Sequence, residues 1–132
     1  MSLFELPFYL RWGITAVFEW HENLVLSSKI AGRDLKLSWA GILSLHYLNG
    51  FLVGLFFLVF AWLLNSLFGL SSFLATGVIF AVLLWTLTLA PIHKSITGLS
   101  PFNHSLGNVP LMASISGHLI YGIVLSFVLT SK

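Results

Sequence analysis

Long apolar stretches separated by short polar segments make up most of this chain. A helix needs about 20 apolar residues to cross a hydrocarbon core of about 30 Å. Three stretches meet that length, and they lie at about 39–64, 70–93 and 110–130. Each of them predicts a transmembrane helix.

A fourth stretch, at 6–26, has the right length but carries Arg11, Glu19, His21 and Glu22. A helix of this kind can also lie along the membrane interface instead of crossing the bilayer. We favour a span, because charged side chains near helix ends can reach the interface or pair within a bundle. The resulting prediction is an all-α fold, a four-transmembrane-helix bundle.

The histidines are spaced as if a helical hairpin had been duplicated. His21 and His46 lie twenty-five residues apart, and so do His93 and His118. All four superimpose when the chain is shifted by seventy-two positions, although few other residues coincide. An imidazole at membrane depth is costly, so it normally has a partner or a function.

This spacing predicts one membrane domain, 1–132, built from two hairpin repeats, 1–68 and 69–132. A pseudo-twofold axis along the membrane normal would relate the two repeats. The same shift that aligns the histidines also pairs Gly50 with Gly122.

Small residues form one face of the second and of the fourth predicted helix. They recur every four residues after a histidine, as Gly50 and Gly54 in one helix and as Gly122 and Ser126 in the other. Faces of this kind let membrane helices approach each other closely. We therefore predict that these two helices pack against each other along these positions.

The composition agrees with an integral membrane protein. Hydrophobic residues make up 58% of the chain and charged residues only 8%, whereas a soluble domain carries roughly 25% charged residues. The mean hydropathy is +0.98. The chain has no cysteine, which excludes disulfides and thiolate metal sites, and its net charge of +2 is too small and dispersed to suggest nucleic acid.

The basic residues predict an orientation. They lie mainly in the connections 27–38 and 94–109, and basic loops usually stay in the cytoplasm. Both termini would then lie outside. At about 1.5 Å of rise per residue, the four histidines would share one layer about 10 Å deep on the cytoplasmic side.

Two of the histidines could be axial ligands of a haem or a chlorophyll. Facing helices hold such cofactors through imidazoles, and a glycine near each ligand gives the macrocycle room. His46 with Gly50, and His118 with Gly122, meet this requirement. Membrane histidines also form hydrogen bonds between helices without any cofactor, and we prefer that structural interpretation.

A metal ion is a second possibility. His21, His93 and Glu22, with Glu19 one turn before Glu22, offer nitrogen and oxygen ligands suited to iron, copper or zinc. Neither half of the chain has the paired Glu-x-x-His signature of di-iron bundles. The alternative role of Glu22 is an electrostatic interaction with a nearby lysine.

Short motifs in two helices suggest a resemblance. The run Gly-His-Leu-Ile-Tyr-Gly occupies 117–122, the second helix carries His46, Gly50 and Gly54, and the third helix ends at a proline. These features resemble a group of small prokaryotic four-helix membrane proteins without an established activity. Ser126 stands where that group would have a glycine. The resemblance covers most of the chain and implies four spans, but no ligand.

The sequence contains no recognisable nucleophile with its base and no phosphate-binding loop, so an independent enzyme is not expected. The leading hypothesis is a non-catalytic accessory or structural subunit of a larger energy-converting membrane complex, respiratory or photosynthetic. The alternatives are a haem- or chlorophyll-binding protein that uses the histidine layer, and a homo-oligomeric channel or transporter. The expected partners are membrane lipids and other membrane subunits.

Overall fold

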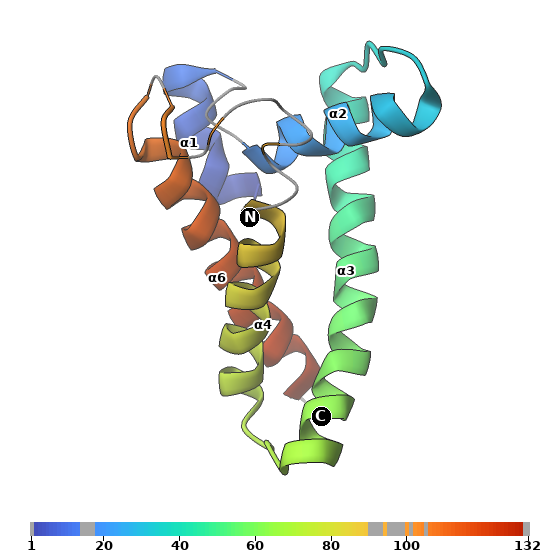
Figure 1. Ribbon diagram of the computed structural model, residues 1–132, viewed down its shortest axis with the longest axis vertical. Coiled ribbons are helices and arrows are strands. Elements are labelled where there is room, and N and C mark those ends of the chain that lie inside the picture. Colours follow the sequence, from blue (N-terminus) through green and yellow to red (C-terminus); the bar gives the residue numbers. More distant parts are fainter. Residues whose placement is uncertain are drawn as a thin grey trace.

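The computed structural model describes residues 2–13, 18–89, 94, 100, 102–104 and 106–130. Within these residues the regular structure is entirely helical, which confirms the predicted all-α class. Figure 1 shows the five helices, which are α1 (Ser2–Trp12), α2 (Phe18–Ala31), α3 (Trp39–Phe68), α4 (Phe73–Leu87) and α6 (Val109–Thr130).

Two helices, α3 and α6, are long and apolar enough to cross a membrane. They correspond to the predicted spans at 39–64 and 110–130. The predicted span at 70–93 contains α4, which is apolar but has only 15 residues among those described here. Among the described residues, two clear candidate spans therefore stand where four were predicted.

The predicted span at 6–26 is wrong, because this segment contains parts of two separate helices. α1 has 11 residues and α2 has 14, so they are only about 17 Å and about 21 Å long. α1 ends where Gly13 takes a φ of +83° and donates its N–H to the carbonyl of Tyr9. In Figure 1, α1 and α2 lie at one end of the molecule, where α2 runs across the first turns of α3.

Local capping explains the hairpin that joins α3 to α4. The Ser38 side chain accepts a hydrogen bond from the Gly41 N–H and starts α3, while Gly69 ends it with a φ of +64°. Only glycine adopts that conformation without strain. The Ser72 side chain accepts from the Ala75 N–H and starts α4, so the chain reverses direction within 69–72.

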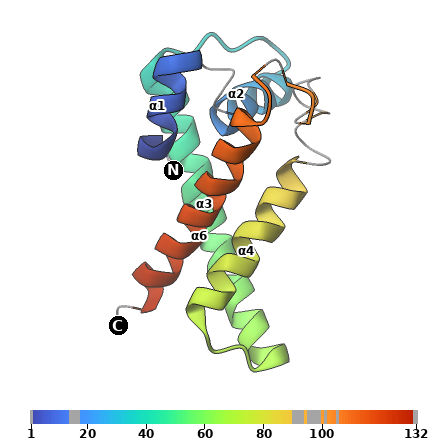
Figure 2. The ribbon, with the colours of Figure 1, turned by 90° about the vertical axis from the view of Figure 1, so that its left-hand side faces the viewer.

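The closest helix pair is α4 with α6 (Figure 2). Gly77 on α4 faces Gly122 on α6, and a Cβ placed on Gly122 would lie 2.9 Å from the Ala81 Cβ. The Ser126 hydroxyl lies 2.9 Å from the carbonyl oxygen of Phe73 on α4 and 2.8 Å from that of Gly122 in its own helix, and it shares its one hydrogen between them. The predicted packing of the second predicted helix on the fourth is therefore wrong, because the small face of α6 contacts α4.

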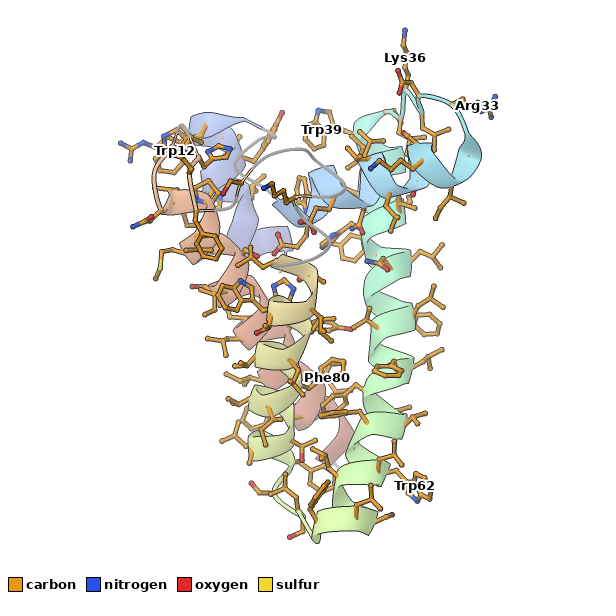
Figure 3. The ribbon with its side chains drawn as sticks, viewed as in Figure 1. Trp12, Arg33, Lys36, Trp39, Trp62 and Phe80 are labelled. Atoms are coloured by element: carbon orange, nitrogen blue, oxygen red, sulfur yellow. The ribbon has the colours of Figure 1, made fainter. Side chains whose placement is uncertain are left out.

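α3 meets the α4–α6 pair mainly through aromatic rings. Phe80 of α4 points toward α3 (Figure 3), with its ring centroid 5.0 Å from that of Phe57 and 5.2 Å from that of Phe60. Phe57 is fully buried by this contact. Between this aromatic contact and α2, α3 stays apart from α6, and the space between them is the cavity described below.

A second aromatic group fixes α1 and α2 against the start of α3. Tyr9, Trp20 and Trp39 come from these three helices, and the Tyr9 and Trp39 ring centroids are 4.5 Å apart. Trp20 is buried and also packs on the His46 ring. This group holds α2 across the end of the cavity.

Candidate functional site

A cavity of about 640 Å³ lies between α2, α3, α4 and α6. Its position follows from the helix packing. The glycines Gly77 and Gly122 let α6 pack closely on α4, whereas aromatic side chains of α3 and α4 keep α3 at a distance from α6. A cavity of this size falls within the range of small-molecule sites in proteins. The residues that line it divide into a polar end and an apolar end.

The polar end lies under α2. Glu19, Glu22 and Asn23 line it from α2, and His46 and Asn49 line it from the first turns of α3. From the opposite wall, α6 adds a further polar residue, His118, and the residue that follows α4, Thr88, adds another. Hydrogen-bonding and ionisable side chains from several helices thus meet at one end of the cavity.

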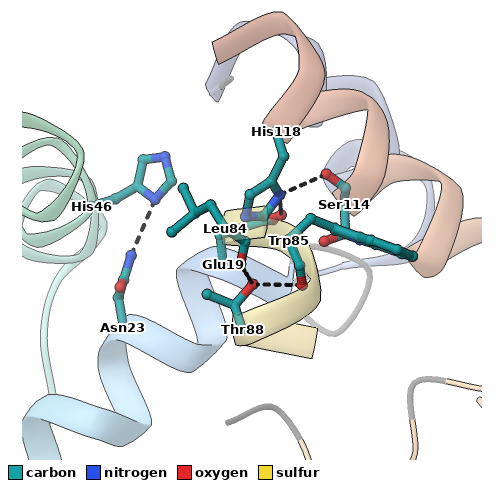
Figure 4. Close-up of polar contacts among 8 residues, drawn as sticks. All are labelled: Glu19, Asn23, His46, Leu84, Trp85, Thr88, Ser114 and His118. Atoms are coloured by element: carbon teal, nitrogen blue, oxygen red, sulfur yellow. Dashed lines mark hydrogen bonds and ion pairs between the residues drawn. The ribbon is translucent and has the colours of Figure 1, made fainter. Parts of the chain in front are cut away.

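One hydrogen-bonded chain links α2 to α3. The Asn49 side-chain amide donates to the Asn23 carbonyl oxygen at 2.9 Å, and the Asn23 amide nitrogen lies 3.2 Å from His46 Nδ1 (Figure 4). With Asn23 donating, Nδ1 of His46 is an acceptor and the neutral ring carries its hydrogen on Nε2. His46 can therefore offer an N–H to a hydrogen-bond acceptor.

His118 is held in the opposite way. Its Nδ1 lies 2.9 Å from the Ser114 carbonyl oxygen and 3.3 Å from Glu19 Oε1. Both neighbours are acceptors, so Nδ1 carries the hydrogen and donates it. Figure 4 shows Glu19 reaching from α2 to the His118 ring on α6, opposite the Asn23–His46 contact. α2 is consequently fixed to both walls of the cavity.

Tyr121 connects α6 to α3 across the cavity. Its hydroxyl donates a hydrogen bond to the carbonyl oxygen of Gly50. A Cβ on Gly54 would lie 3.3 Å from that hydroxyl, whereas a Cβ on Gly50 would have no atom within 4 Å. Gly50 thus borders open cavity space, and Gly54 makes room for the tyrosine.

Beyond Tyr121 the lining is apolar. It consists of aliphatic side chains from three helices, which include Val53, Leu58, Leu84, Leu125 and Val128. In α3 and α6 these residues follow the polar ones along the helix, so they lie farther from α2. The cavity is therefore polar at the α2 end and apolar toward the opposite end.

The predicted tetrapyrrole site is assembled only in part. His46, His118 and Gly50 line one cavity, as the predicted common layer requires. Gly122 instead packs on the Gly77 backbone, so it gives no room to a macrocycle. Each ring also has one of the hydrogen bonds expected for the structural interpretation.

The two imidazoles differ in what they can do for a metal. The Nδ1–H to carbonyl bond of His118 is the arrangement that orients an imidazole for coordination through Nε2. His46, with its hydrogen on Nε2, is a donor there and not a ligand. Axial ligation by this pair would require His46 to exchange its bond with Asn23, and the cofactor stays a prediction.

The predicted metal site falls largely outside the described structure. His93 and the His21 side chain are not among the described residues, while Glu22 lines the cavity. Among the residues that are described, no three His, Asp or Glu side chains come close enough to hold a metal ion. The metal site also stays a prediction.

The sequence-based predictions missed the role of several residues of the site. Asn23 and Gly77 were not considered, and Tyr121 was noted only as part of the run at 117–122. Asn23 and Tyr121 hold the two walls through their side chains, and Gly77 positions α6. Gly77 and Ala81 lie four residues apart, and this spacing in the sequence could have indicated a third small-residue face, on α4. Nothing in the apolar pattern distinguishes Tyr121 from an interfacial tyrosine.

Comparison with known proteins gives no relative: no protein family model matches the chain, and no curated protein and no solved structure is similar to it.

Proposed function

We propose that this chain is a non-catalytic integral membrane protein that holds a lipid-soluble amphiphile in the cavity between α2, α3, α4 and α6. The observation that carries the proposal is the gradient of polarity along the cavity. Polar groups gather under α2, and apart from the Tyr121 hydroxyl the side chains that follow toward the other end are apolar. A molecule with a polar head and an apolar chain matches both ends at once.

The length of the cavity suits a chain-like molecule. His46 and Leu58 both line it, twelve residues apart on α3, which is roughly 18 Å along a helix. An extended alkyl or isoprenoid chain can follow that distance while its head stays among the polar side chains.

The outer surface of α3 supports insertion in a membrane. Its large apolar side chains are widely exposed, for example Phe56, Val59 and Trp62 at 62%, 53% and 65%. Continuous apolar exposure of this kind is unfavourable in water and normal against lipid or a membrane partner. The same surface could contact other membrane subunits, so it is compatible with an accessory subunit of a larger complex. The subunit would then contribute the binding cavity to that complex.

The proposed orientation keeps the basic connections 27–38 and 94–109 in the cytoplasm. Arg33 and Lys36 project from the end of the molecule that holds α1 and α2 (Figure 3). With α1 at that end, we amend the expected topology and propose a cytoplasmic N-terminal helix. The C-terminus, at the far end of α6, keeps its proposed external position.

Tetrapyrrole binding is a second candidate, favoured by one observation. The Ser114 carbonyl holds His118 in the orientation of an axial ligand. An absorption spectrum of the purified protein separates the two candidates, because a bound haem or chlorophyll absorbs strongly in the visible and an alkyl amphiphile does not.

The test of the proposed function fills the cavity without disturbing the helices. Gly50→Leu places a side chain in cavity space, because a Cβ there meets nothing within 4 Å. Ser44→Leu, at an exposed position of α3 outside the cavity, is the matched control. Binding is measured as saturable quenching of tryptophan fluorescence by a nitroxide-labelled dodecanol in maltoside micelles.

We expect saturable quenching in the wild type and in Ser44→Leu, and its loss in Gly50→Leu. Quenching that rises linearly without saturation in the wild type would contradict the proposal. Unchanged saturable binding in Gly50→Leu would contradict it as well, because the amphiphile would then occupy another site.

A further inference from the structure

One buried N–H at the polar end of the cavity has no acceptor. His46 accepts a hydrogen bond from Asn23 on Nδ1, so its hydrogen lies on Nε2. No acceptor among the described residues bonds to that hydrogen, although His46 is only 8% exposed and lines the cavity. We infer that the cavity recognises an amphiphile whose uncharged head group presents a carbonyl oxygen to the His46 Nε2–H. The inference rests on the proposed function.

A buried donor of this kind favours a ligand with an acceptor. Nearly all buried N–H groups in proteins are hydrogen-bonded, because an unpaired one has lost its water and gained nothing in return. Figure 4 shows the His46 ring projecting from α3 with Nδ1 turned to Asn23 on α2. The Trp20 ring packs against it, with 6.0 Å between the ring centroids. The cavity is therefore the side from which an acceptor can reach Nε2.

The hydrogen-bonded chain from α3 to α2 keeps the hydrogen on Nε2. The Asn49 amide donates to Asn23 Oδ1 at 2.9 Å, and this contact directs the oxygen of Asn23 toward Asn49. The nitrogen of the same amide is thereby directed toward His46 Nδ1, at 3.2 Å. Nδ1 remains an acceptor as long as both bonds are formed, so Nε2 remains a donor.

Asn49 supplies a second donor beside the first. Its side-chain nitrogen carries two hydrogens, and only one of them donates to Asn23. His46 and Asn49 are three residues apart on α3, which places them on one face of the helix, and both line the cavity. A carbonyl oxygen has two lone pairs and can accept from both side chains.

Two other donors that line the cavity are already used. The Thr88 hydroxyl donates within its own helix, with the Leu84 carbonyl oxygen at 2.9 Å (Figure 4). The Tyr121 hydroxyl donates to the carbonyl oxygen of Gly50. The hydrogens left for a ligand therefore include those of the α3 wall, which places the head group beside His46.

The lining favours an uncharged acceptor over an anion. Among the described residues that line the cavity there is no lysine or arginine. An anionic head group would lose its water without gaining such a counter-ion, and that loss is costly in an apolar site. A ketone, ester or quinone carbonyl is a good acceptor and carries no net charge.

The experiment compares head groups on one chain. Four nitroxide-labelled amphiphiles carry a methyl ketone, its isostere with a methylene group in place of the oxygen, a hydroxyl or a sulfonate, and each is titrated into the wild-type protein in maltoside micelles. We expect the ketone to bind about tenfold more tightly than the isostere, the effect of one hydrogen bond to a shielded donor. The sulfonate should bind more weakly than the ketone.

Two variants assign this preference to His46. His46→Phe keeps a planar ring and removes the donor, and should weaken ketone binding by about tenfold while leaving the isostere unchanged. His104→Phe is the same substitution at a histidine that does not line the cavity, and should change neither.

Infrared spectroscopy tests the hydrogen bond in the wild type, without any variant. With a heavy carbon isotope in the ketone, the band of the bound carbonyl should appear at a lower frequency than in a hydrocarbon solvent. The shift should be smaller in His46→Phe and unchanged in His104→Phe.

The outcomes separate the inference from the proposed function. If the alcohol binds saturably but the ketone binds no better than its isostere, the inference is wrong and the amphiphile site stands. A carbonyl band at the hydrocarbon frequency in the wild type, or a sulfonate that binds more tightly than the ketone, would also overturn the inference. If none of the four amphiphiles binds saturably, the proposed function itself fails.

Discussion

The same substitution at two glycines should have opposite effects on stability. Gly122→Ala places a Cβ 2.9 Å from the Ala81 Cβ and 3.1 Å from the Gly77 carbonyl carbon, and in contact with the Gly77 carbonyl oxygen. Carbon atoms in contact are normally about 3.5–4.0 Å apart, so α4 and α6 must separate. Overpacking of this kind costs about 1–3 kcal/mol.

The separation would also lengthen the Ser126–Phe73 hydrogen bond, which is 2.9 Å long. Gly50→Ala adds the same atom where no neighbour lies within 4 Å. Replacing a helical glycine by alanine is favourable by up to about 1 kcal/mol, so this variant should be as stable as the wild type or slightly more stable.

The assay is unfolding of the purified protein by sodium dodecyl sulfate in mixed micelles, followed by tryptophan fluorescence. We expect the midpoint of Gly122→Ala to fall clearly below that of the wild type and the midpoint of Gly50→Ala not to fall. Equal destabilisation by the two variants would refute the reasoning. It would indicate that Gly50 and Gly122 face each other, as the spacing of small residues first predicted.

Two further predictions concern the polar contacts between helices, and the same unfolding assay tests both. Ser126→Ala removes a hydroxyl that bonds to Phe73 on α4 and should lower the free energy of unfolding by about 1 kcal/mol; an unchanged midpoint would mean that the contact adds no net stability. Asn23→Leu leaves His46 and Asn49 without their hydrogen bonds to α2 and should lower the free energy of unfolding by about 1–3 kcal/mol. A variant more stable than the wild type would show that apolar packing stabilises this position better than the hydrogen bonds do.

Two spans could be predicted from the sequence because their signal is local. The apolar stretches that became α3 and α6 exceed the thickness of a bilayer, and no packing information is needed to recognise them. That His46 and His118 would lie at one depth was predicted from their distances to the starts of the predicted helices, which are also local in the sequence. In the structure both rings lie at the polar end of one cavity.

The helix pairing could not be predicted in the same way. A small-residue face shows that a helix can approach another closely, but it does not identify the other helix. Three helices carry such a face, with Gly50, Gly77 and Gly122 as examples. Which helices pair depends on the size of the side chains around each small-residue face. Phe57 and Phe60 of α3 pack on Phe80 of α4 and hold α3 away from α6.

The division between α1 and α2 also depends on tertiary contacts. The apolar residues of 6–26 satisfy the length of a span. Gly13 ends α1, and contacts among Tyr9, Trp20 and Trp39 hold both helices at one end of α3. Periodicity alone does not reveal these contacts, and they are what close the polar end of the cavity.

The most direct test of the central claim is to map where an amphiphile binds. A dodecanol with a diazirine near the end of its chain is activated by light in native membranes, and the modified residues are identified by mass spectrometry. The proposed function predicts adducts on cavity residues such as Leu58, Leu125 and Val128, which excess unlabelled dodecanol suppresses and Gly50→Leu abolishes. Adducts confined to the outer surface of α3, at residues such as Phe56 and Trp62, and insensitive to competitor would contradict it.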